Sequence, residues 1–296
     1  MPRRTAQVLD SFYLISTVHI FKESIRVMLL RPTHFHSISI FLFSPLPISL
    51  FISHFLIHAS PQLPFSAISI TDHLFGQIGG VHPLPQLASK TLTHIIICFP
   101  SSITFALLGR AATVQVVSDS YSGINLDGRR LLTRSGSAWI KLLHTTFWEL
   151  LILLSLWVIF VATLVSVPAT LFAYGICSRI LGFWVILGFL GVPFCLAFAH
   201  LMVLGNLAKV LTVLESECCG FKSLVKANNM MAGRQQTALI MALLSNIGLR
   251  LVECLFEFKM SKGISFWEGP MLVSMYSMVL VFDTVTTAVF YYACKP

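Results

Sequence analysis

The stretch TFWELLILLSLWVIFVATLVSVPATLFA, residues 146–173, decides the fold of this chain. It contains one acidic residue, Glu149, and no basic residue, and it exceeds the roughly 20 apolar residues that a helix needs to cross a bilayer. The sequence therefore predicts an all-helical integral membrane bundle of six transmembrane helices. The other five predicted spans are residues 37–58, 92–110, 181–206, 237–256 and 270–293.

The composition supports the same class of protein. The mean hydropathy is +0.82, and 11% of the residues are charged, well below the roughly 25% that is usual for soluble domains. No interval between the predicted spans is long enough for a separate soluble domain. We expect residues 1–36 to form a cytoplasmic arm with an amphipathic helix, and residues 37–296 to form the six-span membrane domain.

The basic residues indicate the orientation of the chain. Most of the 20 Lys and Arg residues fall on alternate segments between the predicted spans, which by the positive-inside rule face the cytoplasm. This distribution by membrane side, and not in one patch, argues against nucleic acid as a partner. We expect both termini to be cytoplasmic, in an endomembrane such as the endoplasmic reticulum or in the plasma membrane.

Each odd-numbered predicted span follows a stretch with apolar residues on one helical face and basic residues on another. Such interfacial helices bury the apolar face at the headgroup boundary and contact anionic lipid with the basic residues. The three units of amphipathic helix and two spans suggest a threefold repeat. In the second and third units the candidate lipid-facing basic residues are Arg130, Arg134, Lys141, Lys222 and Lys226.

Ionisable residues inside the predicted spans are candidates for an intramembrane polar site, because an unpaired charge in the bilayer is costly. Arg250 and Glu253 are three residues apart and can meet on one helical face. Asp283 lies near the middle of the last span. One interpretation is an intramembrane pair or protonation site of Asp283, with or without Arg250, on a transport path. The other is a carboxyl that stays protonated or bonds a threonine and only orients helices.

Prolines in four predicted spans admit two interpretations as well. Kinked helices can line a substrate path, as in secondary transporters, but proline is also simply tolerated in membrane helices. These prolines are Pro45, Pro47, Pro100, Pro168 and Pro193.

Cysteine and histidine suggest little chemistry. Cys218 and Cys219 lie on the third amphipathic stretch, where membrane-proximal cysteines can be S-palmitoylated, and the other interpretation is a pair of free thiols. His54 and His58 share a helical face, but neither carboxylate nor cysteine completes a metal site, so we expect no metal and no cofactor. The chain has no nucleotide-binding loop, no H-E-x-x-H and no nucleophile elbow, and we therefore expect no enzymatic activity.

Several segments resemble a family of plant multi-pass membrane proteins of unknown function. The resemblance rests on Thr104–Leu108, Ser118–Gly123, Lys141–Trp148, His200–Ser216, Gly220–Phe221, Lys226–Ala227, Met231–Arg234 and Val289–Lys295. It extends distantly to bacterial inner-membrane proteins of unknown function and to the membrane domain of some glycerophosphodiester phosphodiesterases. The phosphodiesterase domain is not found in this sequence, so the resemblance implies a membrane bundle without that activity.

The sequence favours a non-enzymatic membrane-organising or partner-binding protein, whose partners include membrane lipids. The alternative is a secondary transporter or channel for a small solute or ion that uses the kinked spans and Asp283.

Overall fold

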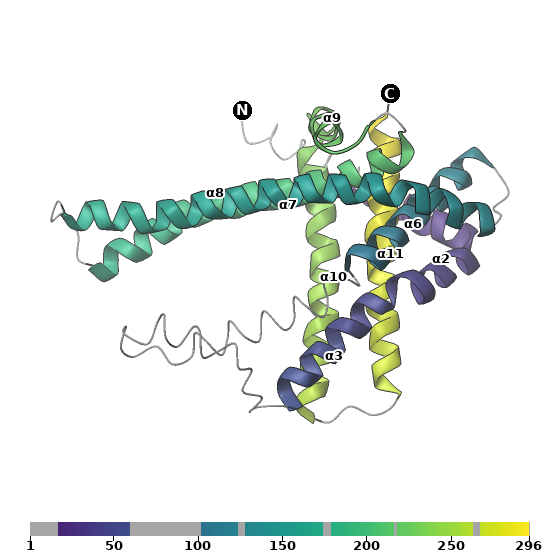
Figure 1. Ribbon diagram of the computed structural model, residues 1–296, viewed down its shortest axis with the longest axis horizontal. Coiled ribbons are helices and arrows are strands. Elements are labelled where there is room, and N and C mark those ends of the chain that lie inside the picture. Colours follow the sequence, from purple (N-terminus) through teal and green to yellow (C-terminus); the bar gives the residue numbers. More distant parts are fainter. Residues whose placement is uncertain are drawn as a thin grey trace, which may run out of the picture. The chain divides into compact units, whose positions relative to one another are not determined.

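The computed structural model describes residues 17–59, 102–123, 128–173, 179–215, 218–262 and 267–295, and these residues are almost entirely helical (Figure 1). Residues 17–30 form the first described helix. The elements after it are α2 (Pro32–Ile38), η1 (Ser39–Phe43), α3 (Pro45–Ala59), η2 (Ser102–Ala106), α6 (Leu107–Ser122), α7 (Gly128–Ala173), α8 (Arg179–Leu214), α9 (Phe221–Met231), α10 (Gln235–Lys262) and α11 (Glu268–Cys294).

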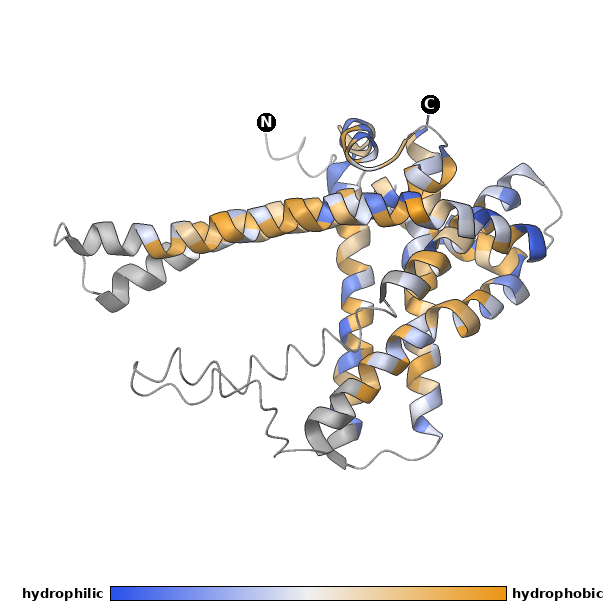
Figure 2. Cartoon of the chain, in the orientation of Figure 1, coloured by the Kyte–Doolittle hydropathy of each residue, from blue (hydrophilic) through white to orange (hydrophobic). Residues whose placement is uncertain are grey.

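Five helical segments of the described chain are long and apolar enough to cross a membrane, which makes this an all-helical membrane protein. They are Pro32–Ile52, Gly128–Ser166, Gly188–Leu214, Gln235–Lys259 and Glu268–Cys294. Figure 2 shows apolar residues along most of the length of these helices. They correspond to five of the six predicted spans. Most of the remaining one, residues 92–110, lies outside the described residues, and its last residues belong to η2 and α6.

The second predicted interfacial helix is not a separate element. The basic stretch that contains Arg130, Arg134 and Lys141 and the apolar stretch that follows it form one continuous helix of 46 residues, α7. The residues between the two stretches include no proline, so no backbone donor is lost and the helix continues from the basic part into the apolar part. By contrast, α9 is separated from α10 by the turn at residues 232–234.

The first predicted span is interrupted at its prolines. The π-helical turn η1 ends at Phe43, and α3 begins at Pro45, whose nitrogen has no hydrogen to donate to an earlier carbonyl. The Ser44 hydroxyl donates to the carbonyl of Ile40, and the Ser44 N–H donates to Ser39 O at 3.0 Å. The Ser44 hydroxyl thus bonds the Ile40 carbonyl, which in the π-helical register would otherwise accept from the nitrogen of Pro45.

The helices form two compact units, each assembled from segments that are distant in the sequence. The first unit comprises Met1–Arg31, Ala111–Asn246 and Phe282–Pro296, and the second comprises Pro32–Arg110 and Ile247–Val281. These units cut across the predicted division at residue 36. That division concerns membrane placement and stays a prediction.

The first unit contains the pair α7 and α8, which run side by side (Figure 1). Phe160 on α7 and Phe194 on α8 stack with ring centroids 4.0 Å apart. Further toward the end of α8, Leu207 and Leu211 are almost completely buried, as is Leu142 on α7. Apolar packing therefore holds the two helices together along their contact.

In the second unit, aromatic packing joins α3, α10 and α11. Phe51 stacks on Phe256 with ring centroids 3.9 Å apart, and the rings of Tyr276 and Phe51 lie edge to face with centroids 6.3 Å apart. Gly109 lets the ring of Phe43 approach the backbone, because a Cβ at Gly109 would lie 2.9 Å from that ring. These contacts form the core of this unit.

Candidate functional site

A buried ion pair joins α7 to α8 within the first unit. The Glu149 carboxylate lies 2.7 Å from the Lys209 ammonium, and the two side chains are only 8% and 12% exposed. Gly205, one helical turn before Lys209, leaves the room for this carboxylate, because a Cβ there would lie 2.0 Å from Glu149 Oε1. A buried charge without a partner of opposite charge is strongly unfavourable. This pair therefore fixes how the two helices face each other.

A set of hydroxyl contacts lies one turn away from the ion pair. The hydroxyls of Thr145 on α7 and Thr212 on α8 are 3.0 Å apart, and the Gly220 N–H donates to Thr145 Oγ1 at 3.0 Å. Gly220 has a φ of 62°, a backbone conformation that residues other than glycine rarely adopt. A Cβ there would also lie 2.4 Å from the His144 ring. This close approach attaches the start of α9 to the α7 and α8 pair.

Glu215, directly after α8, connects α9 with the end of α11. Its carboxylate accepts hydrogen bonds from Lys226 Nζ at 2.5 Å, from Cys218 Sγ at 3.2 Å and from the Tyr291 hydroxyl at 3.2 Å. Burial raises the pKa of Glu215, but the hydrogen bonds and the positive charge of Lys226 outweigh this effect, and the net pKa is lowered. The carboxylate therefore stays ionised and holds α9 in place at neutral pH.

The outer surface of α9 combines apolar and basic side chains. Phe221 and Val225 are 54% and 46% exposed, and Lys222 and Lys226 between and beside them are also exposed. The opposite face of the helix is buried. Its buried residues are Ser223, Leu224, Ala227 and Met231. We call the exposed group, Phe221, Lys222, Val225 and Lys226, the α9 surface.

The other predicted basic residues lie on the first turns of α7. Arg130 is exposed, Lys141 is half-buried, and Arg134 reaches Asp119 on α6 at 3.8 Å while keeping 66% of its side chain exposed. Cys219 is exposed beside α9, whereas Cys218 is partly buried and donates a hydrogen bond to the Glu215 carboxylate. The side chains of His54 and His58 lie outside the part of the structure that is described.

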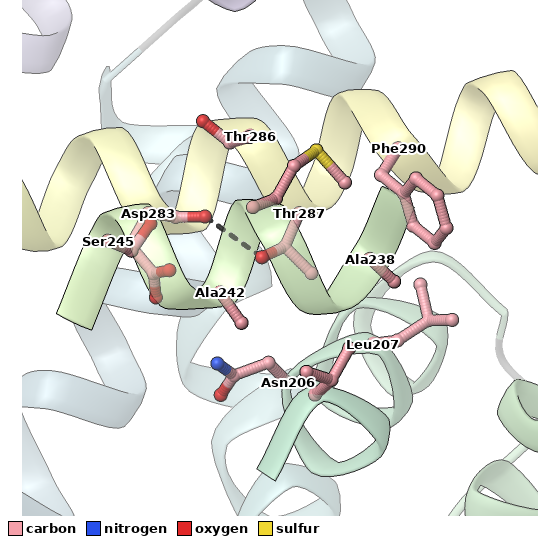
Figure 3. Close-up of a pocket in the computed structure, with 11 residues that line it drawn as sticks. Asn206, Leu207, Ala238, Ala242, Ser245, Asp283, Thr286, Thr287 and Phe290 are labelled. Atoms are coloured by element: carbon pink, nitrogen blue, oxygen red, sulfur yellow. Dashed lines mark hydrogen bonds between the residues drawn. The ribbon is translucent and has the colours of Figure 1, made fainter. Parts of the chain in front are cut away.

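Asp283 lines a small cavity between α8, α10 and α11 in the first unit (Figure 3). Its polar neighbours there are Asn206 on α8, Ser245 on α10, and Thr286 and Thr287 on α11. The cavity has a volume of about 20 Å³, and the apolar part of its lining includes Val203, Leu207, Met241 and Phe290. Of the polar neighbours of Asp283, the sequence predicted only the threonines.

Arg250 and Glu253 belong to the second unit, where they meet as predicted from their spacing. Arg250 Nη1 donates to Glu253 Oε2 at 2.8 Å, and the Tyr276 hydroxyl donates to Glu253 Oε1 at 3.3 Å. The Arg250 side chain is 84% exposed. A pairing of Arg250 with Asp283 stays a prediction.

The sequence analysis did not identify the pairing of Lys209 with Glu149. The signal lay in their positions: an acid near the start of one span and a lysine near the end of the next lie at the same level when the two spans are antiparallel. Gly205, four residues before Lys209, marks the same level by its small size.

The family of the chain is shown by one comparison with known proteins. No curated protein and no solved structure matches it. One family model matches residues 9–296, which include every element of both units. The chain therefore belongs to the family described as "Domain of unknown function (DUF8558)".

Proposed function

We propose that this protein is a non-enzymatic membrane-organising protein that binds anionic lipid through the α9 surface. The observation that carries the proposal is the exposure of Phe221 and Val225 directly beside Lys222 and Lys226. The proposal includes six spans, cytoplasmic termini, and a location in the endoplasmic reticulum or plasma membrane. It also retains the resemblance to plant multi-pass membrane proteins.

The chemistry of the α9 surface matches a headgroup boundary. Exposure of half of a phenylalanine side chain to water is unfavourable. Insertion of the ring between acyl chains removes this apolar surface from water and is therefore favourable. A lysine near an anionic bilayer surface contributes about 1 kcal/mol of attraction. Because Glu215 and the buried face hold α9 against the rest of its unit, this surface is presented without an ordering cost.

Two other stretches support the proposal with the same mixture of side chains. In the helix at residues 17–30, Ile25 and Leu29 are 49% and 72% exposed near the exposed Lys22 and Arg26. At the start of α7, Leu132 is 57% exposed beside Arg130 and Arg134. All three stretches belong to the first unit, and together they would give it several lipid contacts.

The test is native mass spectrometry of the full chain released from bilayers that contain equal amounts of an anionic and a zwitterionic phospholipid. Lys222→Gln should lower the ratio of anionic to zwitterionic lipid retained about fivefold, the equivalent of about 1 kcal/mol. Gln236→Glu is the matched control, because it changes an exposed side chain by the same charge outside α9. Equal ratios for the two variants would contradict the proposal.

The alternative function is a secondary transporter or channel for a small solute or ion, and the observation that favours it is the cavity lined by Asp283 and other polar side chains. The two functions differ in their response to Asp283→Asn. A coupled transporter should lose flux in proteoliposomes while its fold is retained. A membrane-organising protein should keep its lipid ratio and should show no flux in either form.

A further inference from the structure

The Asp283 cavity is lined by apolar side chains and by five oxygen-bearing side chains that come from three helices. Its volume of about 20 Å³ is enough for one water-sized occupant. Figure 3 shows Asp283 and the two threonines on α11, Ser245 on α10 and Asn206 on α8 around it. No histidine or cysteine of the described chain lines the cavity. The site therefore presents only oxygen ligands of the kind that hard cations prefer.

Two of these groups have an unused bonding capacity. Neither the Asp283 carboxylate nor the Ser245 hydroxyl makes a hydrogen bond or ion pair with another described side chain, although Ser245 is only 7% exposed. Thr286 and Thr287 donate their hydroxyl protons to the carbonyls of Phe282 and Asp283, at 2.8 and 2.9 Å. Their oxygen lone pairs stay available to a ligand.

The membrane makes this arrangement expensive unless something neutralises the carboxylate. Asp283 lies inside the segment Glu268–Cys294, which is long and apolar enough to span the bilayer. An unpaired ionised side chain at the centre of a bilayer costs about 2.5 to 3.5 kcal/mol or more. No described lysine or arginine forms an ion pair with Asp283. A bound cation would supply the missing charge.

We infer that the cavity binds one sodium ion, ligated by the Asp283 carboxylate and by oxygens of Ser245 and Asn206. A single carboxylate balances a single positive charge, whereas calcium sites draw on six to eight oxygens, with several carboxylates among them. The small volume favours the smaller of the common alkali ions. This site does not depend on the proposed lipid contact of α9, and neither inference needs the other.

The experiment is thermal unfolding of the purified full chain in detergent, with NaCl exchanged for choline chloride at constant total salt. The unfolding midpoint should rise steadily with the logarithm of the sodium concentration, because only the folded state binds the ion. Asp283→Asn should abolish this dependence. Ser245→Ala should shift it to about tenfold higher sodium, as expected for the loss of one bond to a charged group.

Glu257→Gln serves as the matched control, because it makes the same chemical change at an exposed carboxylate. It should respond to sodium as the wild-type chain does. The inference is overturned if choline and sodium give the same midpoints, if potassium stabilises as strongly as sodium, or if Asp283→Asn keeps the sodium response. Should Asp283→Asn fail to fold, an unshifted response in Ser245→Ala would overturn it as well.

Discussion

The Glu149 carboxylate on α7 and the Lys209 ammonium on α8 are 2.7 Å apart and almost fully removed from solvent. A pair of this kind adds little net stability compared with two apolar side chains of similar volume, but loss of one partner leaves a buried charge. It therefore acts on the specificity of the helix pair more than on its total stability.

Lys209→Met should destabilise the protein by about 3 kcal/mol or more, because the Glu149 carboxyl would be left buried without its partner. The double variant Glu149→Leu with Lys209→Met should recover most of that loss. The measurement is denaturant unfolding in a mild detergent. Additive effects of the two single substitutions would show that the charges are not coupled in the folded protein.

Gly205→Ala should also be destabilising, although alanine is normally the better helix former by about 1 kcal/mol. The reason is that the new methyl group would lie 2.0 Å from Glu149 Oε1 and displace the carboxylate from Lys209. Gly191→Ala on the same helix has open space around it and should be neutral or stabilising. Equal effects of the two alanines, measured by unfolding, would contradict this account.

Gly220→Ala should destabilise the attachment of α9 for two reasons, an unfavourable positive φ and the contact with His144. Gly123→Ala separates these reasons, since Gly123 also has a positive φ, 67°, with no atom near a Cβ. Gly123→Ala should cost about 1 kcal/mol, and Gly220→Ala clearly more. Limited proteolysis near α9 should speed up only for Gly220→Ala.

Glu215 should make stability depend on pH in the acid range. Its pKa is lower in the folded protein than the usual 4.5, so its contribution is fully present above that value and is lost as the pH falls through the folded pKa. Glu215→Gln should be less stable than the wild-type chain at pH 7, and the difference should shrink on acidification. A difference that stays constant down to pH 3 would assign the effect of the substitution to packing.

The spans could be predicted from the sequence because the bilayer sets a minimum length for an apolar helix, which residues 146–173 and 270–293 clearly exceed. The pairing of Arg250 with Glu253 followed from helical spacing alone. The Glu149 and Lys209 pair did not, because it depends on the register between two helices. The neighbours of Asp283 on α8 and α10 escaped prediction for the same reason.

The continuity of α7 has a mechanical consequence. A helix of 46 residues is about 69 Å long at 1.5 Å per residue, more than twice the roughly 30 Å of the hydrocarbon core. A helix of this length that crosses the bilayer near its normal must extend beyond the hydrocarbon core, and no proline or loop separates its basic end from its apolar part. A force on the basic end would therefore change the tilt of the apolar part as well, because the two parts move as one rigid helix.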